Sequence, residues 1–89
     1  MIVRTTYAKL SDPSRRDAIA ERIAEALDGA GHRWAYVGVP ADAASEVWDL
    51  AVHVGCPDDA VVTEVDRRLV AALENRAVVL KAWSFAAAT

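Results

Sequence analysis

Apolar and polar side chains alternate along four segments of this chain, as they do in strands that bury one face. Two longer segments between them repeat apolar side chains every three or four positions, which is helical spacing. The pattern therefore predicts four strands and two helices. The predicted strands are residues 2–10, 32–39, 47–56 and 77–85.

Residues with the chemistry of helix ends bound both helical segments. Residues 11–14 hold a capping aspartate followed by a proline, and residues 28–29 end the first helix. Residues 57–59 cap the second helix, which we expect to end at Asn75. Residues 40–46 are typical of a hairpin connection. The apolar helix positions are Ile19, Ile23, Ala26, Leu27 and Ala30 in the first helix and Val62, Val65, Leu69 and Leu73 in the second.

The order of these elements is strand, helix, strand, strand, helix, strand. Two split βαβ units with right-handed crossovers place such strands in one antiparallel sheet. The sequence therefore predicts an α+β, ferredoxin-like βαββαβ fold, with a four-stranded antiparallel sheet and two helices on one face. The length of 89 residues suits one domain, covering residues 1–89.

The two faces of the predicted sheet differ in the size of their side chains. Small apolar positions suit the face that packs on the helices: Ala35, Val37, Leu50, Val52, Val54, Val78, Leu80 and Ala82. The opposite face then carries Trp34, Tyr36, Asp49, His53, Lys81, Trp83 and Phe85. Soluble monomers rarely leave such an aromatic patch in water, so we expect a second copy to cover it and complete a dimeric α+β barrel.

Charge and cysteine content limit the classes of partner that we expect and indicate a cellular compartment. A net charge of −3, a pI of about 5.2 and the lack of a basic stripe argue against a nucleic-acid partner. No apolar run has the length of a membrane span and the N-terminus lacks a signal-peptide pattern, so we expect a cytoplasmic protein without a membrane partner. The single Cys56 fits a reducing compartment, and no ligand spacing predicts a metal site.

Four short segments, in order along the chain, carry a family resemblance. They are Val3-Arg4, residues 34–38 (Trp-Ala-Tyr-Val-Gly), residues 48–52 (Trp-Asp-Leu-Ala-Val) and residues 81–85 (Lys-Ala-Trp-Ser-Phe). With this element order, the chain resembles the stress-responsive A/B-barrel family, called Dabb, of the dimeric α+β barrel superfamily. The resemblance spans nearly the whole chain and implies the same fold and a homodimer.

The resemblance also implies a chemistry, although one motif is missing. The family includes polyketide cyclases similar to olivetolic acid cyclase, which have a pocket between the helices and the sheet and use a strand-borne His with a Tyr/His pair. Thr5, Val65 and residues 67–70 stand at those positions here, so that acid–base dyad does not carry over. The resemblance implies that Thr5 and Tyr7 face such a pocket. It further implies an aromatic or polyketide-like small-molecule ligand and no cofactor.

Six residues are the candidates for a site. The candidate catalytic residues are His53, whose imidazole can act as a base near neutral pH, and Tyr7, whose hydroxyl can orient a carbonyl. The candidate substrate-binding residues are Thr5, Trp34, Tyr36 and Trp83. Structural roles stay open for all of them: a satisfied polar group for His53, a core aromatic for Tyr7 and a dimer core for the other rings.

Three functions stay open on this sequence. The first is a small dimeric protein that binds an aromatic or polyketide-like molecule and cyclises it without a cofactor. The second is a cofactor-independent monooxygenase of the same superfamily, for which the three Trp residues are suitable lining. The third is a non-catalytic ligand-binding or regulatory module, which has the same element order.

Overall fold

A computed structural model describes residues 1–41 and 47–86, and within them the predicted α+β fold is confirmed. Of the segment predicted as a hairpin connection, residues 42–46 lie outside this described part. The strands begin or end within three residues of the predicted bounds, and a 3₁₀ turn at Pro13–Arg15 precedes the first helix. The elements are β1 (Ile2–Leu10), α1 (Arg16–Leu27), β2 (Trp34–Gly38), β3 (Leu50–Cys56), α2 (Asp59–Leu73) and β4 (Ala77–Ala86).

The helix boundaries follow from local hydrogen bonds that the sequence encodes. The Asp58 carboxylate accepts a hydrogen bond from the Val61 backbone N–H at 3.0 Å, which caps the N-terminus of α2. Asn75 adopts a positive φ of 62° just after α2, where the chain must turn back into β4. Asp12, expected to cap the first helix, instead caps the 3₁₀ turn that leads into α1.

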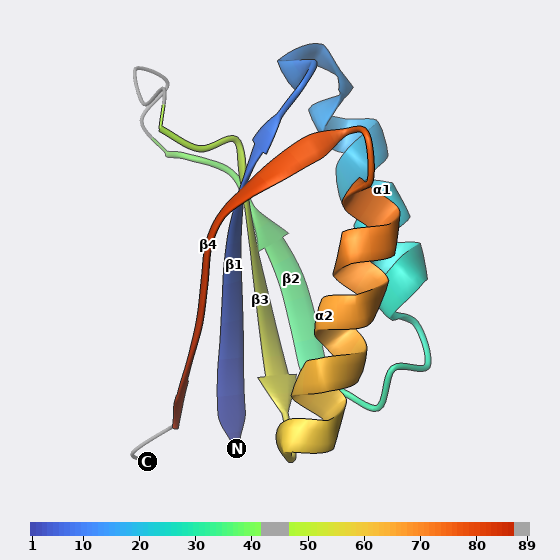
Figure 1. The fold of residues 1–89 in the computed structure, drawn as a ribbon, viewed down its shortest axis with the longest axis vertical. Coiled ribbons are helices and arrows are strands. Elements are labelled where there is room, and N and C mark those ends of the chain that lie inside the picture. The colour runs from blue at the N-terminus through green and yellow to red at the C-terminus, as the bar shows by residue number, and fades with distance from the viewer. Residues whose placement is uncertain (42–46, 87–89) are drawn as a thin grey trace.

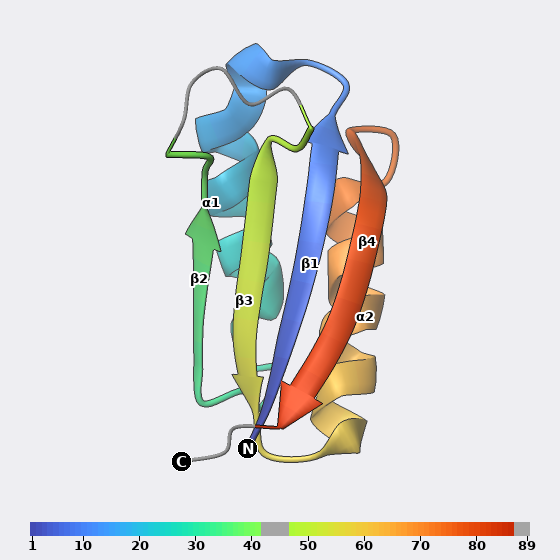
Figure 2. The same ribbon diagram turned by 90° about the vertical axis from the view of Figure 1, so that its left-hand side faces the viewer.

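The four strands form an antiparallel sheet in the order β2-β3-β1-β4. Both helices lie against one face of this sheet, and the described part of the chain leaves the other face open (Figure 1). Figure 2 looks onto that open face, with the helices behind the strands. The core lies between the helices and the sheet: Ala8, Leu10, Ile19, Ile23, Leu27, Ala30, Leu50, Val52, Val54, Cys56, Val65, Leu69 and Leu73.

A β-bulge in β4 overturns part of the predicted face assignment. Ala82 pairs with Thr6 on the helix side as expected, but the register shifts between Tyr7 and Ala8. Ala8 therefore pairs with Val79 rather than with Leu80. One extra residue reverses the alternation of faces, so the prediction that Val78 and Leu80 pack on the helices is wrong. Val78 is 63% exposed and Leu80 is 46% exposed.

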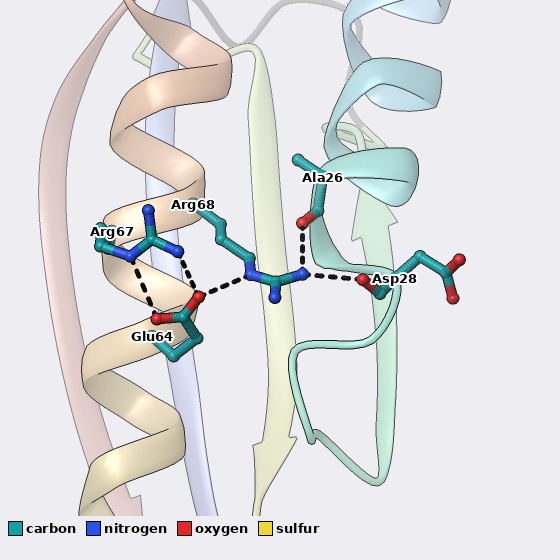
Figure 3. Close-up of polar contacts among 5 residues, drawn as sticks. All are labelled: Ala26, Asp28, Glu64, Arg67 and Arg68. Atoms are coloured by element: carbon teal, nitrogen blue, oxygen red, sulfur yellow. Dashed lines mark hydrogen bonds and ion pairs between the residues drawn. The ribbon is translucent and has the colours of Figure 1, made fainter.

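A polar bridge ties the two helices together on their outer side. Glu64 of α2 accepts hydrogen bonds from Arg67 and Arg68 (Figure 3), and these hold its pKa at about 2, below the ordinary 4.5. Arg68 also donates to the backbone carbonyls of Ala26, at 3.2 Å, and Asp28, at 2.7 Å. Because carbonyls at a helix C-terminus lack partners within the helix, Arg68 satisfies acceptors that α1 leaves open.

Candidate functional site

The antiparallel register places side chains from all four strands in one row across the open face. Tyr36 pairs with His53, His53 pairs with Thr5, and Thr5 pairs with Trp83. We call these four residues the central rung; in Figure 2 they come from β2, β3, β1 and β4 in that order. Four of the six candidate residues therefore meet along a single line.

Two further rows flank the central rung on the same face. Trp34 and Phe85 occupy the ends of one row, with Gly55 and Val3 between them. Tyr7 lies in the other row, beside Ala51 of β3 and Lys81 of β4. We call the three rows together the aromatic face: Val3, Thr5, Tyr7, Trp34, Tyr36, Gly38, Ala51, His53, Gly55, Lys81, Trp83 and Phe85.

The expected helix-side location of Thr5 and Tyr7 is wrong. Thr5 pairs with His53, and Tyr7 lies two residues further along β1, so both belong to the open face. The side chains that β1 sends toward the helices include Arg4, Thr6 and Ala8. All six candidate residues therefore lie on the open face, because the other four were already expected there. Those four are Trp34, Tyr36, His53 and Trp83.

His53 lies at the centre of the aromatic face with one ring nitrogen engaged. Its Nδ1 lies 3.1 Å from the Thr5 hydroxyl oxygen, and Thr5 is only 2% exposed. The Tyr36 ring lies 4.9 Å from the imidazole centroid, and the Tyr7 ring meets it edge-on at 6.5 Å. Within residues 1–41 and 47–86, Nε2 makes no hydrogen bond. A histidine whose Nδ1 is fixed by a hydroxyl can use Nε2 to exchange a proton with a bound molecule.

Aromatic rings surround this imidazole in direct contact with one another. Tyr7 packs edge-on against Trp48, with centroids 5.1 Å apart, and meets Trp83 in a tilted contact at 5.5 Å. Trp34 stacks on Tyr36 at 6.0 Å with an interplanar angle of 20°. Offset and edge-on pairs of this kind are favourable beyond their apolar burial. Trp48 is the member that the sequence did not predict, since it precedes β3 and its strand parity assigns it to the helix side.

Gly55 makes room for one of these rings. A Cβ atom at this position would lie 2.4 Å from Nε1 of Trp34 and 2.9 Å from the Sδ atom of Met1. The Trp34 indole therefore lies directly over the β3 backbone, which only a glycine permits.

The surroundings of Asp49 and Cys56 indicate roles in the fold rather than in a site. The Asp49 carboxylate accepts a 2.7 Å hydrogen bond from the Leu10 N–H and lies 3.6 Å from Arg16, so its charge is satisfied within the fold. Cys56 is fully buried in the core, and burial raises the pKa of its thiol. Since the thiolate is the nucleophile, this environment argues against a nucleophilic role.

Two of the grooves on the helix side lie between a helix and a strand at an edge of the sheet, and Tyr7 lines neither of them. The groove between α1 and β2 has a volume of about 450 Å³ and includes His32, whose Nδ1 is buried without a partner among the described residues. The cleft between α2 and β4 holds about 210 Å³. Arg4 lines this cleft and forms a bidentate pair with Asp66, at 3.0 and 2.8 Å.

The described residues contain neither a cluster of metal ligands nor a membrane-spanning helix. No group of three or more His, Cys, Asp and Glu side chains in residues 1–41 and 47–86 is placed to hold a metal ion. In the same part of the chain, neither helix has the length and apolar character needed to cross a bilayer.

The element order, the strand order and the single helical layer define a ferredoxin-like α+β protein. No family model and no curated protein matches the sequence. Two solved structures do match the fold. HapK from Hahella chejuensis has a TM-score of 0.72 and 16% identity, and the match covers 98% of this chain and 92% of HapK.

The second structure is a DypB variant from Rhodococcus jostii RHA1 in complex with heme. Its TM-score is 0.69 at 19% identity, over 93% of this chain. This chain spans only 38% of that DypB chain. Both matches establish the α+β fold, whereas membership of the Dabb family stays a prediction.

Proposed function

We propose that two copies of this chain pair through their aromatic faces and enclose a site for an aromatic or polyketide-like small molecule. His53 would accept a proton in a cyclisation that needs no cofactor. The observation that carries this proposal is the central rung, in which a hydroxyl fixes an imidazole at the middle of a face lined by aromatic rings.

The exposure of the aromatic face supports pairing of two copies. Tyr36 is 59% exposed and Phe85 is 51% exposed, and both Trp34 and Trp83 are 38% exposed. Side chains of this size in one contiguous patch favour contact with a second protein surface. A partner of the same sequence would present the same rings, as an interface around a twofold axis requires.

The chemistry at the middle of the face supports a role for His53 as a base. The contact with Thr5 fixes the ring orientation and leaves Nε2 directed away from that hydroxyl. Flat aromatic ligands gain contact area from Tyr7, Tyr36 and Trp83, and such rings cost little conformational entropy to order. The DypB neighbour is a complex with heme, so a related fold occurs in a protein that holds a flat ligand.

The first test is the mass in solution. Sedimentation equilibrium should give twice the 9.6 kDa chain mass, and Tyr36→Glu should shift the protein to monomers. Val70→Glu is a matched control, because Val70 is 63% exposed on α2, away from the aromatic face. A monomeric wild-type protein would exclude the pairing.

The second test separates catalysis from binding. With linear poly-β-ketone substrates, His53→Gln should abolish cyclisation and keep the affinity within about threefold, because glutamine is uncharged and of similar size. His32→Gln is the control, since the other histidine lies on the helix side. Binding without turnover would favour a non-catalytic module, and oxygen consumption with phenols would favour the monooxygenase.

A further inference from the structure

The aromatic face has a charge opposite to that of the whole chain. The protein carries 13 acidic and 10 basic residues, yet the three rows of the aromatic face contain no Asp or Glu. Their charged side chain is Lys81, and the titratable imidazole of His53 lies one row away. Asp49 shares the strand parity of this face, but its carboxylate is bonded to Leu10 and lies beside Arg16.

Lys81 holds its ammonium group against the rings. It pairs with Tyr7 across the sheet, and its Nζ lies 4.7 Å from the centroid of the Trp83 ring. In the part of the chain that the structure describes, no carboxylate lies within 4.0 Å of this nitrogen. A cation–π contact leaves the three N–H donors of an ammonium group available to an anion.

We infer that the ligand of the aromatic face is an aromatic anion. Its carboxylate, phenolate or sulfonate group would bind the Lys81 ammonium, while its ring packs against the outer edges of the Tyr7 and Trp83 rings, which contact each other. Charge complementarity favours this occupant, since pairing two copies would bring two Lys81 side chains into one interior without an acidic partner from the aromatic face. Buried charges are stable only when they are paired, and an anionic ligand supplies the pair. This inference rests on the proposed function.

Two fluorescent probes that differ by one charge test the inference. Anilinonaphthalene sulfonate and neutral N-phenylnaphthylamine share the same two ring systems, and the sulfonate adds a negative charge. Wild-type protein should bind the sulfonate about five- to tenfold more tightly, and Lys81→Met should remove that preference. Lys81→Arg should keep it, and added salt should weaken it. The indole N–H resonance of Trp83 should shift on binding, which locates the probe.

Lys9→Met is the matched control for the loss of one positive charge. Lys9 lies 4.0 Å from the Asp49 carboxylate, which offsets its charge, so its loss should leave both affinities within about twofold. Equal binding of the two probes, or equal effects of the two lysine substitutions, would overturn the anionic ligand while leaving the proposed aromatic site intact. Failure of both probes to shift Trp83 would overturn the site as well.

Discussion

Gly55→Ala should destabilise the protein, although a strand with alanine is normally more stable than the same strand with glycine. The new Cβ would lie 2.4 and 2.5 Å from two atoms of the Trp34 indole and 2.9 Å from Met1 Sδ. Carbon atoms do not approach other heavy atoms so closely, so the indole has to move off β3. That displacement would also break the stack of Trp34 on Tyr36.

The magnitude follows from two opposing terms. Inserting a methyl group into a packed contact costs about 1–3 kcal/mol. Replacing glycine by alanine in a strand contributes about 0.5–1 kcal/mol in the other direction, because the unfolded chain loses freedom. The net expectation is a loss of about 1 kcal/mol in the free energy of unfolding, within a range of about 0 to 2.5 kcal/mol.

Gly38→Ala is the matched control on the same face. A Cβ at Gly38 would lie 3.9 Å from the Ala51 carbonyl oxygen, an ordinary contact, so this change should be neutral or stabilise by up to about 1 kcal/mol. Urea unfolding followed by far-ultraviolet circular dichroism, at one protein concentration and with unchanged m, measures both changes.

A double-mutant cycle isolates the contact with Trp34. In a Trp34→Leu background the indole is absent, so Gly55→Ala should lose most of its cost, leaving a coupling energy of about 1–2 kcal/mol. If Gly55→Ala is as harmless as Gly38→Ala, and if its effect is the same in both backgrounds, then the indole does not pack over β3 and our description of this row is wrong.

Two further predictions concern the bridge between the helices. Arg68→Ala should lower the free energy of unfolding by about 1–2 kcal/mol, because two carbonyls at the end of α1 lose a charged donor. Arg67→Ala should have a much smaller effect in the same unfolding assay, because its ion pair with Glu64 is exposed to water. The Glu64 carboxyl should titrate near its pKa of about 2 by NMR. Because folding lowers this pKa from 4.5, its contribution to stability is complete above pH 4.5 and is lost as the pH falls toward 2. A titration at 4.5 in the folded protein would contradict the bridge.

The sequence predicted the elements of the fold because each one follows from neighbouring residues. Helical spacing, the Asp58 cap and the alternation along β3 are local signals, and the structure repeats them. The bulge in β4 leaves no such signal, since an extra residue in a strand of valines and leucine looks like regular alternation. Its position depends on pairing with β1, which lies far away in the sequence.

The faces of β1 were ambiguous for a related reason. Arg4 and Thr6 are polar, and the family resemblance implied that their neighbours Thr5 and Tyr7 face the helices instead. The structure does the reverse, because Arg4 finds a bidentate partner in Asp66 of α2. A cationic side chain can face a helix when that helix supplies a carboxylate within hydrogen-bonding distance.

The orientation of β1 determines whether the candidate site forms, because the central rung exists in only one register of β1 against β3. A slip of one residue between β1 and β3 would send Thr5 to the helix side and separate its hydroxyl from His53. Asp49 fixes this register at the end of the ladder: its N–H donates to the Ala8 carbonyl, and its carboxylate accepts from the Leu10 N–H. Asp49 therefore acts on the site from outside it, because it sets the pairing that holds the hydroxyl of Thr5 against the imidazole.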